Sequence, residues 1–544
     1  MQPPSEPVAA RGPVLAADWD PERDLLVWIG DGGRGGIPER ARGKRAFVLV
    51  RDPVPAIDGA RTLSGVHELF QELLVLSGPP PAHALVHRDA TADPALQRAA
   101  AEAVRNALRA RALQRATVEQ RGEAWLLQGL ANLPALARVP SIERLRGALT
   151  GRPCVLVSPG PSLSKNLAVL AGLRERALIV SGTHALLALQ RAGVVPHLVV
   201  CADPGDLSRH WAGVDLTCVE AFVVGATCRP EAFAVPARRC FSFASNGPAD
   251  DWIFGALGES ATLPTGGSVS CSQLSLALHL GCDPIVFVGQ DLSFAERFYA
   301  AEGLDGDAEV ESAGPGAFRL VKPAGSAGPG RLLDDGRLRF TREKPVLEVA
   351  GWSGGTVCTT PQLKAYLDWF EAALPTAATR ARVLNCTEGG ARIAGAEHVT
   401  LADASRGWAP LPDAAPFLDR AYEAHDADAR RRALLAMTRG HLAGLEECLR
   451  RAARCREHLP RAARDASARE ALGRSEKKLA QALRNAALTS LSAQAEIAAA
   501  REAARRATDL AANLAATERL YAIVERAAAL LREPLRAACR VLGG

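Results

Sequence analysis

The chain has 544 residues, 48% of them hydrophobic, and a formal net charge of +5. This length is too great for one hydrophobic core and predicts two to four domains. The small net charge offers no whole-molecule attraction to nucleic acid or to a membrane, and no uninterrupted apolar run approaches the roughly 18 residues of a membrane-spanning helix.

The cysteines and the first residues predict a cytoplasmic location. The 12 cysteines include no Cys-x-x-Cys pair, and several fall in apolar, strand-like runs. This pattern favours reduced thiols in the core of a cytosolic protein. The N-terminus lacks the basic start and apolar stretch of a secretory signal. Histidines and cysteines show no metal-ligand spacing, so we expect no metal and no tightly bound cofactor.

Residues 1–120 are predicted to form a small N-terminal α/β domain. Leu25–Ile29 and Ala46–Val50 have the composition of strands, and an Ala-rich helix is expected from Pro94 to Gln114. Residues 121–150 are then expected to form a connector to the next domain.

Residues 151–403 are predicted to form the central domain. Strand and helix signals alternate along it, which indicates a doubly wound, mostly parallel, Rossmann-like sheet. Within it, residues 302–336 are rich in glycine, proline and acidic side chains and have almost no periodicity. Long irregular loops inside compact domains are uncommon and are often lids, so we expect a partly mobile lid here.

Residues 412–544 are predicted to form a helical bundle. Alanine, arginine, leucine and glutamate dominate this part, and Leu435, Leu442, Leu445 and Leu449 fall on one helical face. The arginines favour a solvated face, and a surface for a partner is the alternative.

The most informative motif is the turn Ser158–Leu163. It follows the apolar strand Val155–Val157 and precedes a stretch with helical spacing. Backbone N–H groups at such a turn can hold an anion, so we expect a phosphate cradle. Gly160 and Pro161 would shape it, and the hydroxyl of Ser162 would add a donor. The alternative is a tight strand-to-helix turn without a ligand.

Further polar groups stand where the predicted strands end. The polar and glycine residues that directly follow predicted strands are Thr183, His184, Asp203, Gly289, Gln290, Asp291, Asn385, Thr387 and Glu388. A further turn directly precedes a predicted helix and consists of Thr265, Gly266, Gly267 and Ser268. The carboxyl ends of parallel strands meet at one edge of the sheet, where open α/β sheets bind nucleotides. These residues are therefore expected to line one ligand site.

Each of these residues also has a purely structural interpretation. Asp203 can stabilise an Asx turn before Pro204. His184 can be a histidine at the start of a helix. Asp291 follows the most apolar strand of the chain, an expensive place for a charge unless something binds it, and its alternative role is a helix N-cap.

These motifs together resemble a known family, the motility accessory factor (Maf) proteins, in their central domain. The resemblance rests on Asn132-Leu-Pro134, Gly160-Pro-Ser-Leu163, Asp203-Pro204, Gly266-Gly-Ser268, Gly289-Gln-Asp-Leu292 and Asn385-Cys-Thr-Glu-Gly-Gly-Ala391, in family order. It covers roughly Trp125 to Leu401. Maf proteins are flagellin glycosyltransferases that transfer nonulosonic acids, and the same domain type occurs in archaeal 6-hydroxymethylpterin pyrophosphokinases.

The resemblance implies a glycosyltransferase that moves a nonulosonic acid from a CMP-activated donor to Ser or Thr of flagellin. The strand-end residues named above would bind the donor, and Tyr299 would support the leaving phosphate. The helical bundle and the N-terminal domain would present flagellin.

The general base of this reaction is left open by the sequence. The family resembles bacterial sialyltransferases, in which a histidine downstream of the strand matching Gly289–Asp291 is the base. No histidine occurs here between His279 and His398. The candidates are therefore Asp291, Glu388 and, third, His184.

Two other functions remain as alternatives. One is ATP-dependent diphosphate transfer to a pterin, which would need Mg²⁺ and carboxylates such as Asp203 and Asp291. The other is a non-catalytic adaptor for flagellin that keeps a degenerate nucleotide fold.

Overall fold

A computed structural model describes most of the chain. It covers residues 24–29, 46–49, 61–63 and 83–88 with a few positions between them, and 93–543 except 245–249, 264–265, 324–329, 412, 463 and 486–492. The chain forms two compact units, of which the first is Met1–Thr117 with Leu367–Thr376 and the second is Val118–Tyr366 with Ala377–Gly544. Among the described residues, no helix is long and apolar enough to cross a membrane.

The first unit contains a small parallel sheet with strand order β3-β2-β1-β4. Its strands are β1 (Leu25–Ile29), β2 (Ala46–Leu49), β3 (Arg61–Leu63) and β4 (Ala84–Arg88). The central strand β1 is fully buried, as its unbroken apolar sequence Leu-Leu-Val-Trp-Ile predicts. Val104 and Ala107 of helix α2 belong to the same hydrophobic core.

Helix α2 is longer than the sequence predicted. It runs from Pro94 to Arg138 as one helix and includes Pro134. The expected end at Gln114 is therefore wrong, and much of the expected connector 121–150 is helical. A short 3-10 helix, η2 (Ile142–Leu145), follows it.

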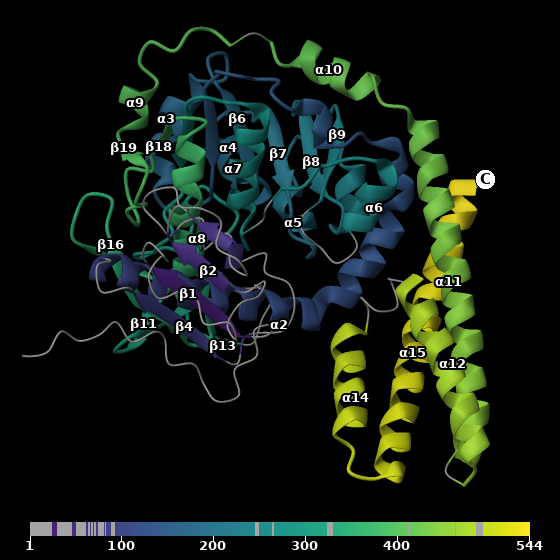
Figure 1. The fold of residues 1–544 in the computed structure, drawn as a ribbon. Coiled ribbons are helices and arrows are strands. Elements are labelled where there is room, and N and C mark those ends of the chain that lie inside the picture. Colours follow the sequence, from purple (N-terminus) through teal and green to yellow (C-terminus); the bar gives the residue numbers. More distant parts are fainter. Residues whose placement is uncertain are drawn as a thin grey trace, which may run out of the picture. The chain divides into compact units, whose positions relative to one another are not determined.

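The second unit is built on an eight-stranded sheet with strand order β19-β18-β10-β5-β6-β7-β8-β9 (Figure 1). Every pairing in it is parallel. Its strands are β5 (Cys154–Val157), β6 (Leu178–Gly182), β7 (Leu198–Cys201), β8 (Ala221–Gly225), β9 (Cys240–Phe243), β10 (Ile285–Val288), β18 (Val383–Asn385) and β19 (Glu397–His398). The predicted mixed α/β architecture with a mostly parallel central sheet is confirmed.

The strand order of this sheet places its ligand crevice. From β5 the chain proceeds outward through β6, β7, β8 and β9, and then returns to place β10 on the other side of β5. The order therefore reverses between β5 and β10. In open α/β sheets, ligands bind outside the carboxyl ends of the strands at such a reversal.

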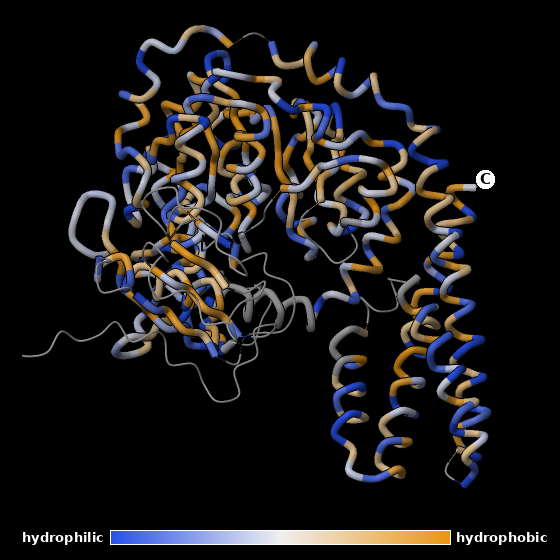
Figure 2. Tube along the Cα trace, viewed as in Figure 1, coloured by the Kyte–Doolittle hydropathy of each residue, from blue (hydrophilic) through white to orange (hydrophobic). Residues whose placement is uncertain are grey.

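Helices cover this sheet and close its core. They include α3 (Leu163–Ala171), α4 (Leu186–Arg191), α5 (Ser208–Trp211), α6 (Asp250–Leu257), α7 (Val269–Leu280) and α9 (Leu401–Ala404). Most of helix α8 (Pro361–Ala378) belongs to the first unit, where Ala372 packs against the hydrophobic core. Strands β5 and β10 share one buried cluster with α3, which includes Val155, Val286 and Leu167. Figure 2 shows many hydrophobic segments, in orange, in the part of the trace that Figure 1 labels as this sheet.

The expected irregular lid at 302–336 is largely a small antiparallel sheet instead. Its strands are β11 (Glu309–Gly314), β12 (Ala317–Lys322), β13 (Gly330–Leu332) and β14 (Leu338–Phe340), with β15 (Lys344–Pro345) added to β12. A separate hairpin follows, of β16 (Leu347–Ala350) and β17 (Thr356–Thr359). The sequence hid these strands because β11 and β13 are mostly exposed and carry no apolar alternation.

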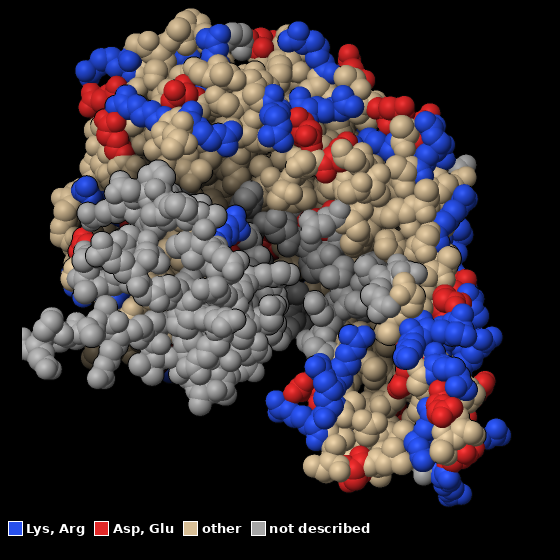
Figure 3. Space-filling model, in the orientation of Figure 1, with Lys and Arg blue, Asp and Glu red and all other residues tan. Residues whose placement is uncertain are grey.

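The C-terminal part is helical, as expected. It contains α10 (Ala415–Glu423), α11 (Ala427–Ala462), α12 (Ala466–Asn485), α14 (Gln494–Arg506) and α15 (Leu510–Gly543). Figure 3 shows basic and acidic side chains together on these helices, and many pair within one helix, such as Arg451 with Glu447. This arrangement is that of a solvated, charged face.

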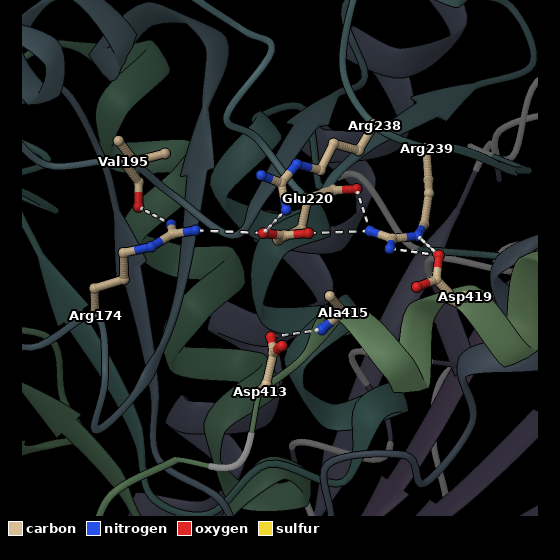
Figure 4. A network of polar contacts seen from close by, with 8 residues as sticks. All are labelled: Arg174, Val195, Glu220, Arg238, Arg239, Asp413, Ala415 and Asp419. Atoms are coloured by element: carbon tan, nitrogen blue, oxygen red, sulfur yellow. Dashed lines mark hydrogen bonds and ion pairs between the residues drawn. The ribbon is translucent and has the colours of Figure 1, made fainter.

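An ionic network ties α10 to the large sheet (Figure 4). The buried carboxylate of Glu220, just before β8, accepts hydrogen bonds from Arg174, Arg238 and Arg239. Arg239 also donates to Asp419 of α10, with 2.6 Å between Nε and Oδ1. The first C-terminal helix is therefore anchored to the sheet rather than joined by a loose linker.

Candidate functional site

The crevice between β5 and β10 brings two of the sequence motifs together. Ser158 follows β5 and Gln290 follows β10, and the Ser158 hydroxyl donates to Gln290 Oε1 at 2.5 Å. Gly289 has a φ of +66°, and a Cβ there would lie 2.2 Å from the carbonyl oxygen of Ser158. Only glycine lets the two strand ends approach this closely.

The turn Ser158–Leu163 holds a carboxylate from its own chain. Asp291 accepts from the backbone N–H of Ser162, at 3.1 Å to Oδ1, and from the Ser162 hydroxyl, at 2.7 Å to Oδ2. A Cβ on Gly160 would lie 2.1 Å from Asp291 Oδ2. The sequence predicts that the Ser162 donors are free for a phosphate and that Gly160 lets it approach the backbone. In this structure both features serve Asp291 instead.

Burial dominates the ionisation of Asp291. It raises the pKa of the Asp291 carboxyl to about 6, although the hydrogen bonds from Ser162 and the charge of Lys165 act in the opposite direction. This carboxyl is 6% exposed. A raised carboxyl pKa means that the folded protein holds the proton more tightly than the unfolded chain does. The contribution of Asp291 to stability therefore falls as the pH rises from about 4 to about 6.

Replacing Asp291 by asparagine is expected to remove this pH dependence. The free energy of unfolding of Asp291→Asn should improve relative to wild type by roughly 2–3 kcal/mol between pH 4 and pH 7, because the variant carries no charge to desolvate. Melting curves of both proteins at several pH values measure the gap. A gap that stays constant across this range would contradict the assigned ionisation.

The motif after β18 closes the other side of the crevice. Thr387 accepts from the backbone N–H of Gln290 at 3.2 Å and donates its own N–H to Asn385. Glu388 has a φ of +58°, and its side chain accepts from the N–H of Leu401 at 2.9 Å. Its carbonyl oxygen accepts from Lys165 Nζ at 2.8 Å. Three motifs far apart in the sequence are thus joined by hydrogen bonds.

Lys165 was missed as a candidate site residue. It is exposed in the first turn of α3. A cation in the first turn opposes the helix dipole, which favours negative groups there. An anionic ligand bound at this end of the helix would be attracted by the Lys165 charge, which would offset the unfavourable interaction with the helix dipole. The signal in the sequence was a lysine directly after the turn motif.

A second cluster surrounds His184, which follows β6. The imidazole of His184 stacks on the ring of Tyr299, with 4.4 Å between ring centroids. Its Nε2 lies 3.2 Å from Asp305 Oδ2. The hydroxyl of Thr183 lies 3.0 Å from Nδ1 of His210. The structure therefore brings Thr183, His184 and Tyr299 together, as a common site requires.

Ionisation in this cluster is strongly shaped by its environment. Burial lowers the pKa of His210 to about 4, so that His210 is neutral at pH 7. Burial also raises the pKa of Tyr299 to about 12, helped by the charge of Asp305. Burial would raise the pKa of Asp305 too, but the nearby His184 ring and the hydrogen bond from Lys322 hold it well below its usual value. Asp305 is thus a permanent anion facing His184.

Asp203 and the glycine turn before α7 have a less definite place. Asp203 is exposed and accepts from the N–H of Gly205 at 2.7 Å, which is an Asx turn. A pocket of about 150 Å³ lies beside it. Gly266 has a φ of +50° and Gly267 a φ of +85°, and a Cβ on Gly267 would lie 3.1 Å from the ring of Tyr366. Ser268 ends this turn next to α7, and Thr265 lies outside the described residues.

Carboxylates that could hold a metal are not gathered in the described part of the chain. No group of three or more His, Cys, Asp and Glu side chains there is arranged as a metal site. Asp203 and Asp291, the two carboxylates considered for Mg²⁺, are both engaged by backbone N–H groups.

Comparisons with known proteins identify the domain around this site. Residues 128–297 match the family model described as 6-hydroxymethylpterin diphosphokinase MptE-like. The chain therefore contains an MptE-like domain, which includes β5 to β10. Among solved structures, the Maf glycosyltransferase from Magnetospirillum magneticum AMB-1 is similar at 13% identity and a TM-score of 0.43, over 89% of this chain and 69% of that chain. No curated protein matches.

Proposed function

We propose that this protein is a glycosyltransferase that moves a nonulosonic acid from a CMP-activated donor to Ser or Thr of flagellin. The observation that carries the proposal is the hydrogen-bonded junction of three family motifs at the reversal of strand order. Ser158 with Gln290, Ser162 with Asp291 and Gln290 with Thr387 form it. The sequence resemblance to the Maf central domain supplies the reaction type.

The nucleotide monophosphate of the donor binds at the first turn of α3. Asp291 holds the turn from within, so the phosphate lies on its outer side, where Lys165 attracts it. Asp291 thereby acts as a positioning residue for the turn. Its raised pKa and its two bonds to Ser162 agree with that task.

His184 is the general base that the geometry favours. Asp291 and Glu388 each have carboxylate oxygens committed to backbone N–H groups. His184 instead lies against the anionic Asp305 through Nε2, at 3.2 Å. In the tautomer with the proton on Nε2, the nitrogen near Asp305, Nδ1 is the basic nitrogen. It takes the proton of the acceptor hydroxyl as that oxygen bonds the sugar and the nucleotide monophosphate leaves.

The helical C-terminal part is proposed to dock flagellin. Long helices with charged faces offer helix-on-helix recognition. Their anchoring through Glu220, Arg239 and Asp419 keeps them attached to the domain that holds the donor.

Diphosphate transfer from ATP to a pterin is the second candidate function. The description of the matching family model favours it. It requires Mg²⁺ beside the phosphates. Asp203 and Asp291 are the two carboxylates that the sequence offers for this metal.

Nucleotide-dependent melting distinguishes the two functions. CMP without metal is expected to raise the melting midpoint, because a ligand at about 100 times its dissociation constant stabilises the fold by roughly 2.7 kcal/mol. ATP with Mg²⁺ should have a smaller effect. Lys165→Met should lose the CMP shift, since it removes the cation at the end of α3.

Arg176→Met is the matched control for this experiment. Arg176 is an exposed cation after α3 that bonds the carbonyl of Gly172, so its removal should leave the CMP shift intact. Stabilisation by ATP and Mg²⁺ but not by CMP would replace the glycosyltransferase by the diphosphotransferase. No shift with either nucleotide would favour the adaptor.

A further inference from the structure

Asp305 lies at the centre of a cluster of cations that come from different elements. Arg209 of α5 donates to it at 3.0 Å, and Lys322 of β12 donates to it at 3.0 Å. His184 is the third partner. The Asp305 side chain is only 9% exposed, whereas that of Arg209 is 57% exposed. The cluster is thus buried on the side of the carboxylate and open on the side of the arginine.

Positive charge is in surplus around this carboxylate. Arg209 and Lys322 are two fixed cations against the single charge of Asp305, even with His184 neutral. Lys344 of β15 lies outside these ion pairs, with its Nζ 5.3 Å from the centre of the Phe298 ring. Burial lowers the pKa of Lys344, and the charges of Lys322 and Arg342 lower it further. An anion bound between cations relieves the repulsion of their like charges.

The cluster lies next to the proposed donor site. Ala300 donates its N–H to the carbonyl of Pro159 at 2.9 Å, so the segment before Asp305 crosses the turn at the end of β5. The hydroxyl of Ser164 in α3 donates to the carboxylate of Glu302. Tyr299 stacks on His184 in the same segment. The segment that carries Asp305 therefore contacts both the turn after β5 and helix α3.

We propose that Arg209 and Lys322 form an oxyanion-binding site that takes a carboxylate or phosphate group of the substrate. The proposal rests on the proposed function and deepens it, because an activated nonulosonic acid carries a carboxylate in addition to its phosphate. Asp305 is the internal counter-ion of this site. It orders the cations when the site is empty and leaves a net positive charge for the incoming group.

Equilibrium binding of two small probes tests the site. N-acetylneuraminic acid, which is a nonulosonic acid, presents a carboxylate, and inorganic phosphate presents the other oxyanion. At least one is expected to bind at millimolar concentration. Arg209→Met and Lys322→Met should each weaken that binding about tenfold or more, because charge-assisted hydrogen bonds are lost. Asp305→Asn should strengthen it, because a competing negative charge is removed.

The methyl ester of N-acetylneuraminic acid separates the two sources of the oxyanion. A carboxylate site prefers the acid over its ester, and the preference should vanish in Lys322→Met. A phosphate site binds inorganic phosphate and neither sugar. Arg319→Met is the matched control, because Arg319 lies on the same strand but pairs with Glu343. Its probe affinity should equal that of wild type.

Binding that is absent in wild type, or equal in wild type, Arg209→Met and Lys322→Met, would overturn the proposal. Arg209 is exposed, so its variant folds without repacking the core and keeps the test valid. The experiment distinguishes failure of this proposal from failure of the proposed function. If CMP raises the melting midpoint but the variants bind the probes as wild type does, only the oxyanion site is refuted. If probe binding depends on Lys322 but CMP causes no melting shift, the oxyanion site is supported and the proposed transfer from a CMP-activated donor is refuted.

Discussion

His184→Gln is expected to lower turnover by about 10² to 10⁴, the usual worth of general base catalysis. Glutamine keeps a hydrogen-bonding group of similar reach toward Asp305 but has no nitrogen that can take a proton. Donor binding should change little, because the base acts on the acceptor hydroxyl. Single-turnover rates and the CMP-induced melting shift, measured on the same variant, separate the two effects.

Three comparison variants make this test specific to His184. Asp291→Asn should weaken donor binding more than turnover at saturating donor, because Asp291 holds the turn through Ser162. Glu388→Gln should retain most of the turnover. His279→Gln should be fully active, because His279 lies in the last turn of α7, where its Nε2 is hydrogen-bonded to the carbonyl of Ile142. Full activity of His184→Gln, with a large loss in Glu388→Gln or Asp291→Asn, would reassign the base.

The large sheet was predictable from the sequence because its strands are buried on both faces. Val155–Val157 and Ile285–Val288 are short, unbroken apolar runs followed by small and polar residues, and this pattern indicates parallel strands. The meeting of Ser158 with Gln290 followed from it, since parallel strands end at the same edge. The exposed strands β11 and β13 gave no such signal.

The occupant of the turn was not predictable in the same way. The pattern after β5 indicated an anion, and both a phosphate and a carboxylate satisfy it. Asp291 fills part of that role from 129 residues away. Asp305 was missed for a similar reason, since its partners Arg209 and Lys322 are distant in sequence. A local sequence pattern shows which donors and acceptors a turn or helix end provides. It does not show which side chain, distant in sequence, forms hydrogen bonds with them in the folded protein.

The residues that we proposed as one donor site differ in how far the structure connects them. Ser158 and Thr387 are hydrogen-bonded to Gln290, and Ser162 is hydrogen-bonded to the next residue, Asp291. Their roles with a donor stay predictions, as do those of Asp203 and of the turn from Gly266 to Ser268.

Flagellin made together with this protein is expected to gain mass, and flagellin made without it is expected to gain none. In a host that supplies a CMP-activated nonulosonic acid, each modified Ser or Thr should add the mass of that acid less one water, because an O-linked bond forms as the nucleotide leaves. The same flagellin made without the protein should keep its unmodified mass. His184→Gln should give little or no added mass while remaining folded.

The intact mass of flagellin is therefore the measurement that tests the central claim most directly. We predict discrete additions of nonulosonic acid that need both this protein and the activated donor. An unmodified mass in the presence of the folded protein and a supply of CMP-activated nonulosonic acids, or additions that persist when the donor is withheld, would contradict the proposed glycosyltransferase.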